Sequence, residues 1–268
     1  MLPALIAMGI FTTLVCLVII GYFGFDHTHF QNTTALHSLL GIVLGLFLVF
    51  RTNSAYDRWW EGRKQWGSMV NSTRNFALKL NAYLDVADQE NRAWFAQMIP
   101  NFVVATKEHL RQGVQVSELE FSDESIATKI KEAAHKPNMI AGMLYSRVNS
   151  LCQQKKLSGE QFWLLDKEMK GFIDIMGACE RIKYTPIPYS YSMFIKKFIF
   201  IYIITLPFGF VTTFEYITIP TVLLITFVLL SVELIAEEIE DPFGRDINDL
   251  PTDELAVKIK DNVREILL

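Results

Sequence analysis

The chain has 268 residues, of which 51% are hydrophobic and 20% are charged, and its formal net charge is −4 at pH 7. This composition excludes a disordered, collagen-like or disulfide-scaffold protein, and it leaves no global basic field for nucleic-acid binding. The apolar residues are gathered into long blocks, which indicates a membrane protein.

Four apolar segments are long enough to cross a bilayer, because a spanning helix needs about 20 such residues. The first has no charge before Asp26 and the second has none before Arg51. A cleavable signal peptide is the alternative for the first segment. Only Glu215 separates the third and fourth segments, which predicts a tight helical hairpin that Pro207 and Pro220 kink or break locally. The predicted spans cover residues 2–25, 34–50, 198–214 and 216–232.

The distribution of Lys and Arg sets the expected orientation. Of the 25 basic residues, 21 lie within residues 51–197 and the other four follow the fourth span, while the two short connections contain none. By the positive-inside tendency, residues 51–197 and both termini are predicted to be cytoplasmic, in a multi-pass protein of the cell inner membrane.

Residues 51–197 are predicted to form a helical cytosolic region, because no alternating strand pattern recurs there. The second span is expected to continue without a break as one helix over residues 34–84. Ser158 is the predicted N-cap of a later helix, with Gln161 as its capping-box partner. The later helices are predicted over residues 91–112, 123–135, 141–152 and 158–182.

The cytosolic tail, residues 233–268, carries 11 acidic and 4 basic side chains, whereas residues 51–197 carry a basic excess. The opposite charges favour a tail that folds back onto the cytosolic helices, with solvated charge as the alternative.

Signatures of common enzyme chemistry are missing from the sequence, which has no phosphate-binding glycine loop, HExxH, GxSxG or CxxC. Asp26, His27 and His29 could ligate a metal, although three ligands within four residues are hard to direct at one ion. The sequence therefore gives little support for an enzyme.

The second span carries an apolar stripe, since Ile42, Leu46 and Phe50 recur every four residues and so stack along one side of a helix. A ridge of small residues that allows close helix approach runs beside it, at Ser38, Gly41 and Gly45. The stripe is either an ordinary packing face or the lining of a narrow axial pore in an oligomer, where apolar rings gate by dewetting. The periodicity alone leaves both interpretations open.

Three motifs resemble the bestrophin family, in the same order along the chain. Residues 51–63 read RTNSAYDRWWEGR, followed by Trp66 and Gly67, and they resemble the signature that follows the second span in bestrophins. Residues 179–182 read CERI and residues 185–189 read TPIPY, as at the entry to the third span of the family. Residues 240–244 read EDPFG and residues 248–251 read NDLP, as in the segment after its fourth span. The compact length is most similar to the prokaryotic bestrophin homologues.

The resemblance implies an all-α homopentameric ion channel with four transmembrane helices and a helical cytosolic domain per subunit, which pack around one central pore. The whole chain, residues 1–268, would be a single domain of this type, with membrane lipids, its own copies and permeating monovalent ions as its partners. Counting back from the first motif, the three apolar positions of the pore neck fall on Ile42, Leu46 and Phe50.

The resemblance also implies two further sites. The second constriction, the cytosolic aperture, falls on Glu160, where the family often has an apolar residue. The acidic positions that help bind calcium in animal bestrophins fall on Asp246 and Asp249, which supply the carboxylate oxygens that this ion prefers. A structural acidic turn is the alternative for these two residues. Calcium is thus the one possible cofactor, and no other is expected.

Five copies of Glu160 would form a carboxylate ring, which attracts cations and repels anions. The alternative is that Glu160 is an ordinary first-turn residue, favoured there by the helix dipole and turned away from the axis. With the acidic tail, this ring favours a cation-selective channel. The alternatives are an anion (chloride) channel, as in animal and plant bestrophins, and a membrane scaffold that conducts nothing.

Overall fold

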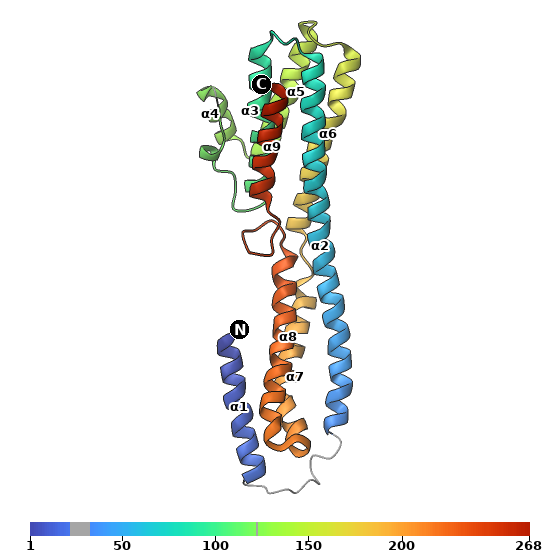
Figure 1. The fold of residues 1–268 in the computed structure, drawn as a ribbon, viewed down its shortest axis with the longest axis vertical. Helices are drawn as coiled ribbons and strands as arrows, with labels where there is room; N and C mark the ends of the chain where they lie inside the picture. The colour runs from blue at the N-terminus through green and yellow to red at the C-terminus, as the bar shows by residue number, and fades with distance from the viewer. Residues whose placement is uncertain (22–32, 122) are drawn as a thin grey trace. The chain divides into compact units, whose positions relative to one another are not determined.

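The computed structural model describes residues 1–21, 33–121 and 123–268, and these residues form helices and loops without any strand. They divide into two compact units, each drawn in Figure 1. The first unit comprises Met1–Arg58 and Pro186–Glu240, and the second comprises Trp59–Thr185 and Asp241–Leu268. Helix α2 (Thr33–Tyr83) contributes residues to both units. Its length confirms the unbroken helix expected over residues 34–84.

The described part of the first unit is built from four apolar helical segments. They are α1 (Leu2–Gly21), the N-terminal part of α2, α7 (Tyr189–Phe214) and α8 (Thr218–Glu240). Their shared core is mostly apolar and non-aromatic, and it is made by Met8, Leu44, Leu48, Ile195, Ile199, Tyr202, Ile203, Leu206 and Val222. Among the described residues, three stretches are long and apolar enough to cross a membrane: Leu2–Gly21, Thr34–Tyr83 and Tyr189–Glu240, the last of which contains both α7 and α8. Residues 22–25 of the first predicted span and the connection that follows it lie outside the described residues.

The predicted hairpin between α7 and α8 is present, and its turn is as short as expected. Glu215 ends α7 with a φ of 50°, a backbone conformation that favours glycine, and a 3₁₀ turn at Glu215–Ile217 leads into α8. Of the kink or break expected at Pro207, a break is wrong, because α7 continues through this residue. Pro220 lies in the first turn of α8, where a missing backbone N–H costs no helical hydrogen bond.

Close contact between α2 and α7 depends on two glycines. A Cβ atom built on Gly41 would lie 2.6 Å from the Tyr202 hydroxyl oxygen, and one on Gly209 would lie 2.5 Å from His37 Nδ1. Larger side chains at these positions would therefore push α2 and α7 apart. The small-residue ridge predicted on α2 thus makes a close helix contact at Gly41.

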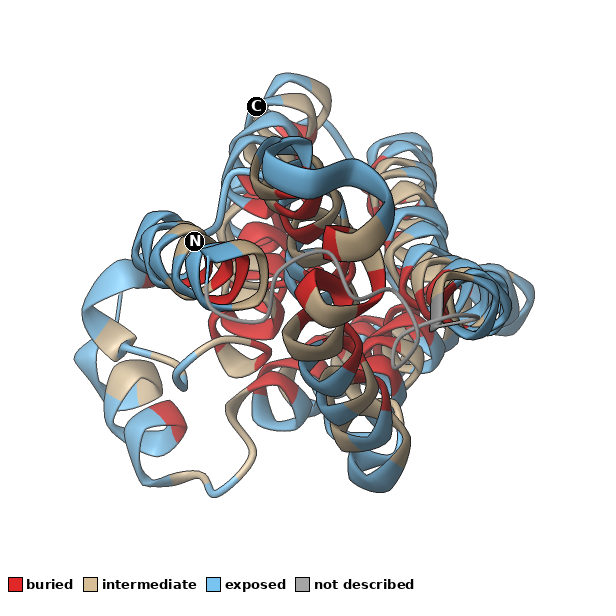
Figure 2. Ribbon diagram, turned by 90° about the horizontal axis from the view of Figure 1, so that it is seen from below, coloured by how far each residue is buried: buried red, intermediate tan, exposed pale blue. Residues whose placement is uncertain are grey.

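The second unit is a helical bundle with an aromatic centre. Phe172 of α6 lies with its ring centroid 5.5 Å from those of Phe76 and Phe102, on α2 and α3. Figure 2 shows the buried residues gathered on one side of most helices, as expected of amphipathic elements. The further elements are α3 (Gln89–His109), the 3₁₀ helix η2 (Val116–Glu118), α4 (Glu124–Glu132), α5 (Lys136–Gln153), α6 (Gly159–Tyr184) and α9 (Thr252–Leu267).

Two predictions for the second unit are confirmed in detail. Ser158 caps α6, and its side chain and that of Gln161 form the reciprocal capping box. The tail folds back, because α9 packs on α3 and buries its apolar face, which consists of Ala256, Ile259, Val263 and Leu267.

Candidate functional site

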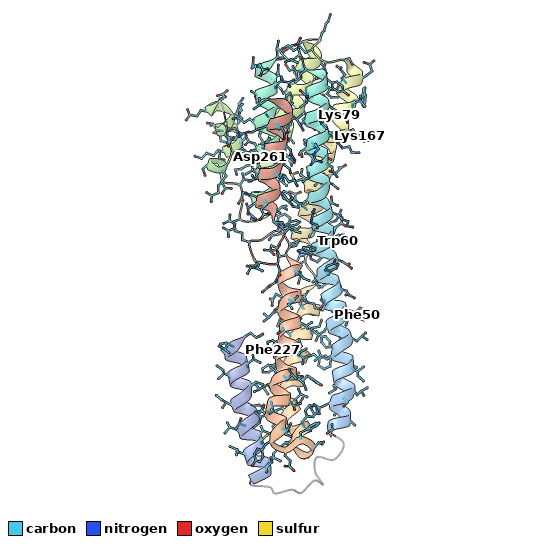
Figure 3. The ribbon with its side chains drawn as sticks, in the orientation of Figure 1. Phe50, Trp60, Lys79, Lys167, Phe227 and Asp261 are labelled. Atoms are coloured by element: carbon cyan, nitrogen blue, oxygen red, sulfur yellow. The ribbon has the colours of Figure 1, made fainter. Side chains whose placement is uncertain are left out.

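The predicted neck residues lie on a face of α2 that none of the described residues of the first unit covers. Ile42, Leu46 and Phe50 are 71%, 56% and 54% exposed, while Leu44 and Leu48 on the same helix are buried in the core. At 3.6 residues per turn, the three neck positions lie roughly opposite this buried face. Figure 3 labels Phe50 on α2. The structure thus places the three residues together on one stripe that is turned away from the helices of its own unit.

Directly after the stripe in the chain, a buried arginine joins α2 to α8. The side chain of Arg51 is 1% exposed, and its Nη1 lies 2.7 Å from Glu240 Oε2, with Glu233 Oε1 3.8 Å from its Nε. Taking these charges out of water is costly, so the pair holds only if its geometry is kept. Arg51 directly follows Phe50, so this ion pair fixes the rotation of the helix that carries the stripe.

Glu240 also receives two hydrogen bonds within the first unit. The backbone N–H of Ile187 donates to Glu240 Oε1 at 2.9 Å, and Arg58 Nε donates to its carbonyl oxygen at 3.0 Å. One residue therefore joins α2, the start of α7 and the end of α8. This role of Glu240 was not predicted from the sequence, although Arg51, Ile187 and Glu240 each belong to one of the three motifs.

Within the second unit, residues of the first and third motifs pack against one another. A Cβ atom on Gly62 would lie 3.2 Å from the side chains of Phe243 and Leu250, so that only glycine allows this approach without movement. Trp59 Nε1 donates to the carbonyl oxygen of Asn248 at 2.9 Å. The motif at residues 240–251 is thereby packed against the motif at residues 51–63.

Glu160, the predicted aperture residue, lies in the first turn of α6 and is exposed. Hydrogen bonds from the Ser158 hydroxyl and from its own backbone N–H lower the pKa of the Glu160 carboxyl group. The side chain is therefore ionised at neutral pH and carries the charge that the predicted ring requires.

Asp246 and Asp249, the predicted calcium ligands, lie in one turn. The backbone N–H of Asp246 donates to Asp249 Oδ2 at 2.7 Å, and a Cβ atom on Gly244 would lie 2.5 Å from the same oxygen. Burial raises the pKa of Asp249, and this effect outweighs the hydrogen bond from Asp246, which lowers it. Asp249 thus has a role in the turn itself, with its Oδ1 buried and without a hydrogen-bond partner.

The other sequence candidate for a metal site, residues 26–29, lies outside the described residues. Within the described ranges, one cluster of three or more potential ligands has its ligand atoms close together, namely His109, His135 and Glu180. Sequence reasoning missed this cluster because its members are 26 and 45 residues apart.

Comparison with known proteins agrees with the motifs. The family described as Bacterial/Fungal Bestrophin protein matches residues 1–265. This chain belongs to the bestrophin family. Among the bestrophin's relatives is a voltage-dependent anion channel-forming protein of Nostoc sp., 39% identical over 229 residues that cover 84% of this chain and 75% of the relative. A protein of the same description from Synechocystis sp. is 35% identical over 232 residues, with the same two coverages.

Solved structures give the same result for the fold of this bestrophin. A point mutant of a bacterial bestrophin homologue from Klebsiella pneumoniae superposes with a TM-score of 0.91 at 26% identity, over 99% of this chain and 98% of the homologue. The protein is therefore an all-helical membrane protein of a channel family.

Proposed function

We propose that this bestrophin is a homopentameric ion channel of the cell inner membrane. The N-terminal part of α2, together with α1, α7 and α8, would supply four transmembrane helices per subunit. Residues 51–197 and the tail would be cytosolic, with both termini on that side. The support is the agreement of the basic-residue distribution, the apolar segments and the family membership.

The observation that carries the proposal is the uncovered stripe of Ile42, Leu46 and Phe50. An exposed apolar stripe opposite the buried face of its own helix is expected to be covered by another apolar surface. Lipid or other copies of the chain can supply that surface. Five copies of α2 around an axis would turn this stripe into a neck that excludes water and ions until it opens or wets. A measurement of the mass of the detergent-solubilised complex tests the stoichiometry, and a monomer or dimer would contradict it.

For the permeating ion, we propose small monovalent cations, because Glu160 is exposed and ionised at the position of the predicted aperture. Anion conduction is the alternative, and the names of the relatives from Nostoc sp. and Synechocystis sp. favour it. A cation channel would give a reversal potential close to that of potassium in a planar bilayer under a KCl gradient. Glu160→Gln would then move this potential towards zero, whereas Glu90→Gln, which removes an exposed carboxylate elsewhere on the second unit, would leave it unchanged. A wild-type potential near that of chloride would contradict cation selectivity.

Calcium binding at Asp246 and Asp249 remains a prediction, supported by the buried Oδ1 of Asp249 without a hydrogen-bond partner. Calorimetric titration with Ca²⁺ should show binding that is lost in Asp246→Asn. Equal binding by the wild type and this variant would exclude the site. A membrane scaffold would instead show no ion flux.

A further inference from the structure

The second unit holds a cluster of two imidazoles and one carboxylate outside the predicted pore. His109 is the last residue of α3, His135 directly precedes α5, and Glu180 lies near the end of α6. The Nε2 atoms of His109 and His135 lie 2.7 and 2.8 Å from the same carboxylate oxygen, Oε1 of Glu180. All three potential ligand atoms lie within 4.8 Å of one another. Three elements that are distant in the chain thus bring their ligand atoms to one point.

The cluster is open to water and holds a charged carboxylate. The side chains of His109, His135 and Glu180 are 21%, 31% and 26% exposed, so an ion can reach them from solution. Burial raises the pKa of Glu180, but the hydrogen bonds from His135 and His109 lower it. Together the lowering effects outweigh burial, so the pKa of Glu180 lies below its usual value. The carboxylate is therefore ionised at neutral pH, as a metal ligand must be.

We propose that His109, His135 and Glu180 form a binding site for a divalent transition-metal ion, with Zn²⁺ as the best-fitting ion. Two imidazole nitrogens and one carboxylate oxygen are a ligand set that zinc accepts, and three protein ligands leave a fourth position for water. Calcium and magnesium are disfavoured, because they prefer oxygen ligands throughout.

Binding would exchange hydrogen bonds for metal bonds. Each Nε2–H now donates a hydrogen bond to Glu180 Oε1. Metal coordination needs the Nε2 lone pair instead, so a neutral imidazole that binds the ion would carry its proton on Nδ1. The Nδ1 of His135 at present accepts the backbone N–H of Asn138 at 3.2 Å, a bond that caps α5. Zinc would therefore break this cap contact while it fixes the ends of α3, α5 and α6 to one another. The site would stabilise the second unit irrespective of whether the protein conducts ions.

The experiment is zinc binding by the full-length, detergent-solubilised protein without a polyhistidine tag, measured by equilibrium dialysis and metal analysis. His27→Ala and His29→Ala are introduced first, because these two histidines could hold zinc by themselves. We expect this background to retain one ion per chain. Adding His109→Gln or His135→Gln should weaken binding by about tenfold or more. Glutamine keeps an N–H donor for Glu180, so the packing of the cluster is preserved.

Two outcomes would overturn the site. One is zinc binding that disappears with His27→Ala and His29→Ala, and the other is binding that survives both glutamine substitutions unchanged. If a glutamine variant does not fold, hydrogen exchange of the background protein decides. Zinc should slow exchange in peptides that contain His109 and Glu180, and unchanged exchange there would contradict the proposal. Neither measurement depends on ion flux, so failure of the metal site and failure of the channel are separate results.

Discussion

The buried guanidinium of Arg51 offers the sharpest test of a single residue. Glu240→Gln removes the charge that lies 2.7 Å from Arg51 Nη1 and leaves the cation buried, with only Glu233 at 3.8 Å. Breaking a buried ion pair costs about 3–5 kcal/mol. We therefore expect a marked fall in the free energy of unfolding in detergent.

The matched control for this prediction is Glu237→Gln on the same helix. Glu237 pairs with Lys196, and both side chains are well exposed, so that its loss should cost less than about 1 kcal/mol. Equal effects of the two substitutions would mean that Arg51 does not depend on Glu240.

Asp253 provides a test by pH. Its carboxylate accepts hydrogen bonds from Arg111 Nη2 at 2.8 Å and Lys107 Nζ at 2.7 Å, and these two partners hold its pKa below the usual value. A depressed pKa stabilises the fold above the pKa of the unfolded chain, about 4, and this contribution is lost as the pH falls through the folded value. Because the side chain is more than half exposed, Asp253→Asn should cost only about 1 kcal/mol at pH 7. The difference from wild type, measured by urea unfolding, should shrink below pH 4, and a difference that grows there would contradict the assignment.

At the scale of elements, α9 is the helix that sequence reasoning missed. The docking of the tail was predicted from its acidic excess alone. In the structure, both acidic and basic side chains of the tail form ion pairs, since Asp253 pairs with Lys107 and Lys260 pairs with Glu120. The signal that could have found the helix is the apolar spacing of Ala256, Ile259, Val263 and Leu267, which repeats every three or four residues.

The apolar face of α9 should therefore carry its docking. Ile259→Ala truncates a buried side chain and is expected to cost about 2–5 kcal/mol. Val257→Ala, at an exposed position of the same helix, should change the free energy of unfolding by less than about 0.5 kcal/mol. Hydrogen exchange of α9 should rise only in the first variant, and unchanged exchange in both would show that the charged pairs hold the helix.

The ends of α7 and α8 show where sequence reasoning stops short. The predicted spans end at the first charges, because hydropathy measures the fit to lipid and not the length of a helix. The structure continues α7 back to Tyr189 and α8 on to Glu240, and Lys196 and Glu237 pair across these extensions at 2.8 Å. In contrast, the start of α6 was predictable to the residue, because a capping box is a local signal.

For the whole molecule, the sequence motifs were sufficient to predict the family and the all-helical fold, both of which are confirmed. The anchor at Glu240 and the cluster at His109, His135 and Glu180 were not predictable, because both depend on contacts between distant segments. The neck assignment remains a prediction. It combines the four-residue spacing of the three apolar side chains with their exposure among the described residues of the first unit.

The central claim is that ions pass along the stripe on α2, and the conductance of Leu46→Ala in planar bilayers tests it most directly. Leu224→Ala is the control, because it removes an exposed leucine of the first unit from α8. We expect Leu46→Ala to raise the conductance severalfold, because a smaller apolar ring wets more easily, and Leu224→Ala to leave it at the wild-type value. Equal conductance in all three proteins, or none in any of them, would contradict a neck at Ile42, Leu46 and Phe50.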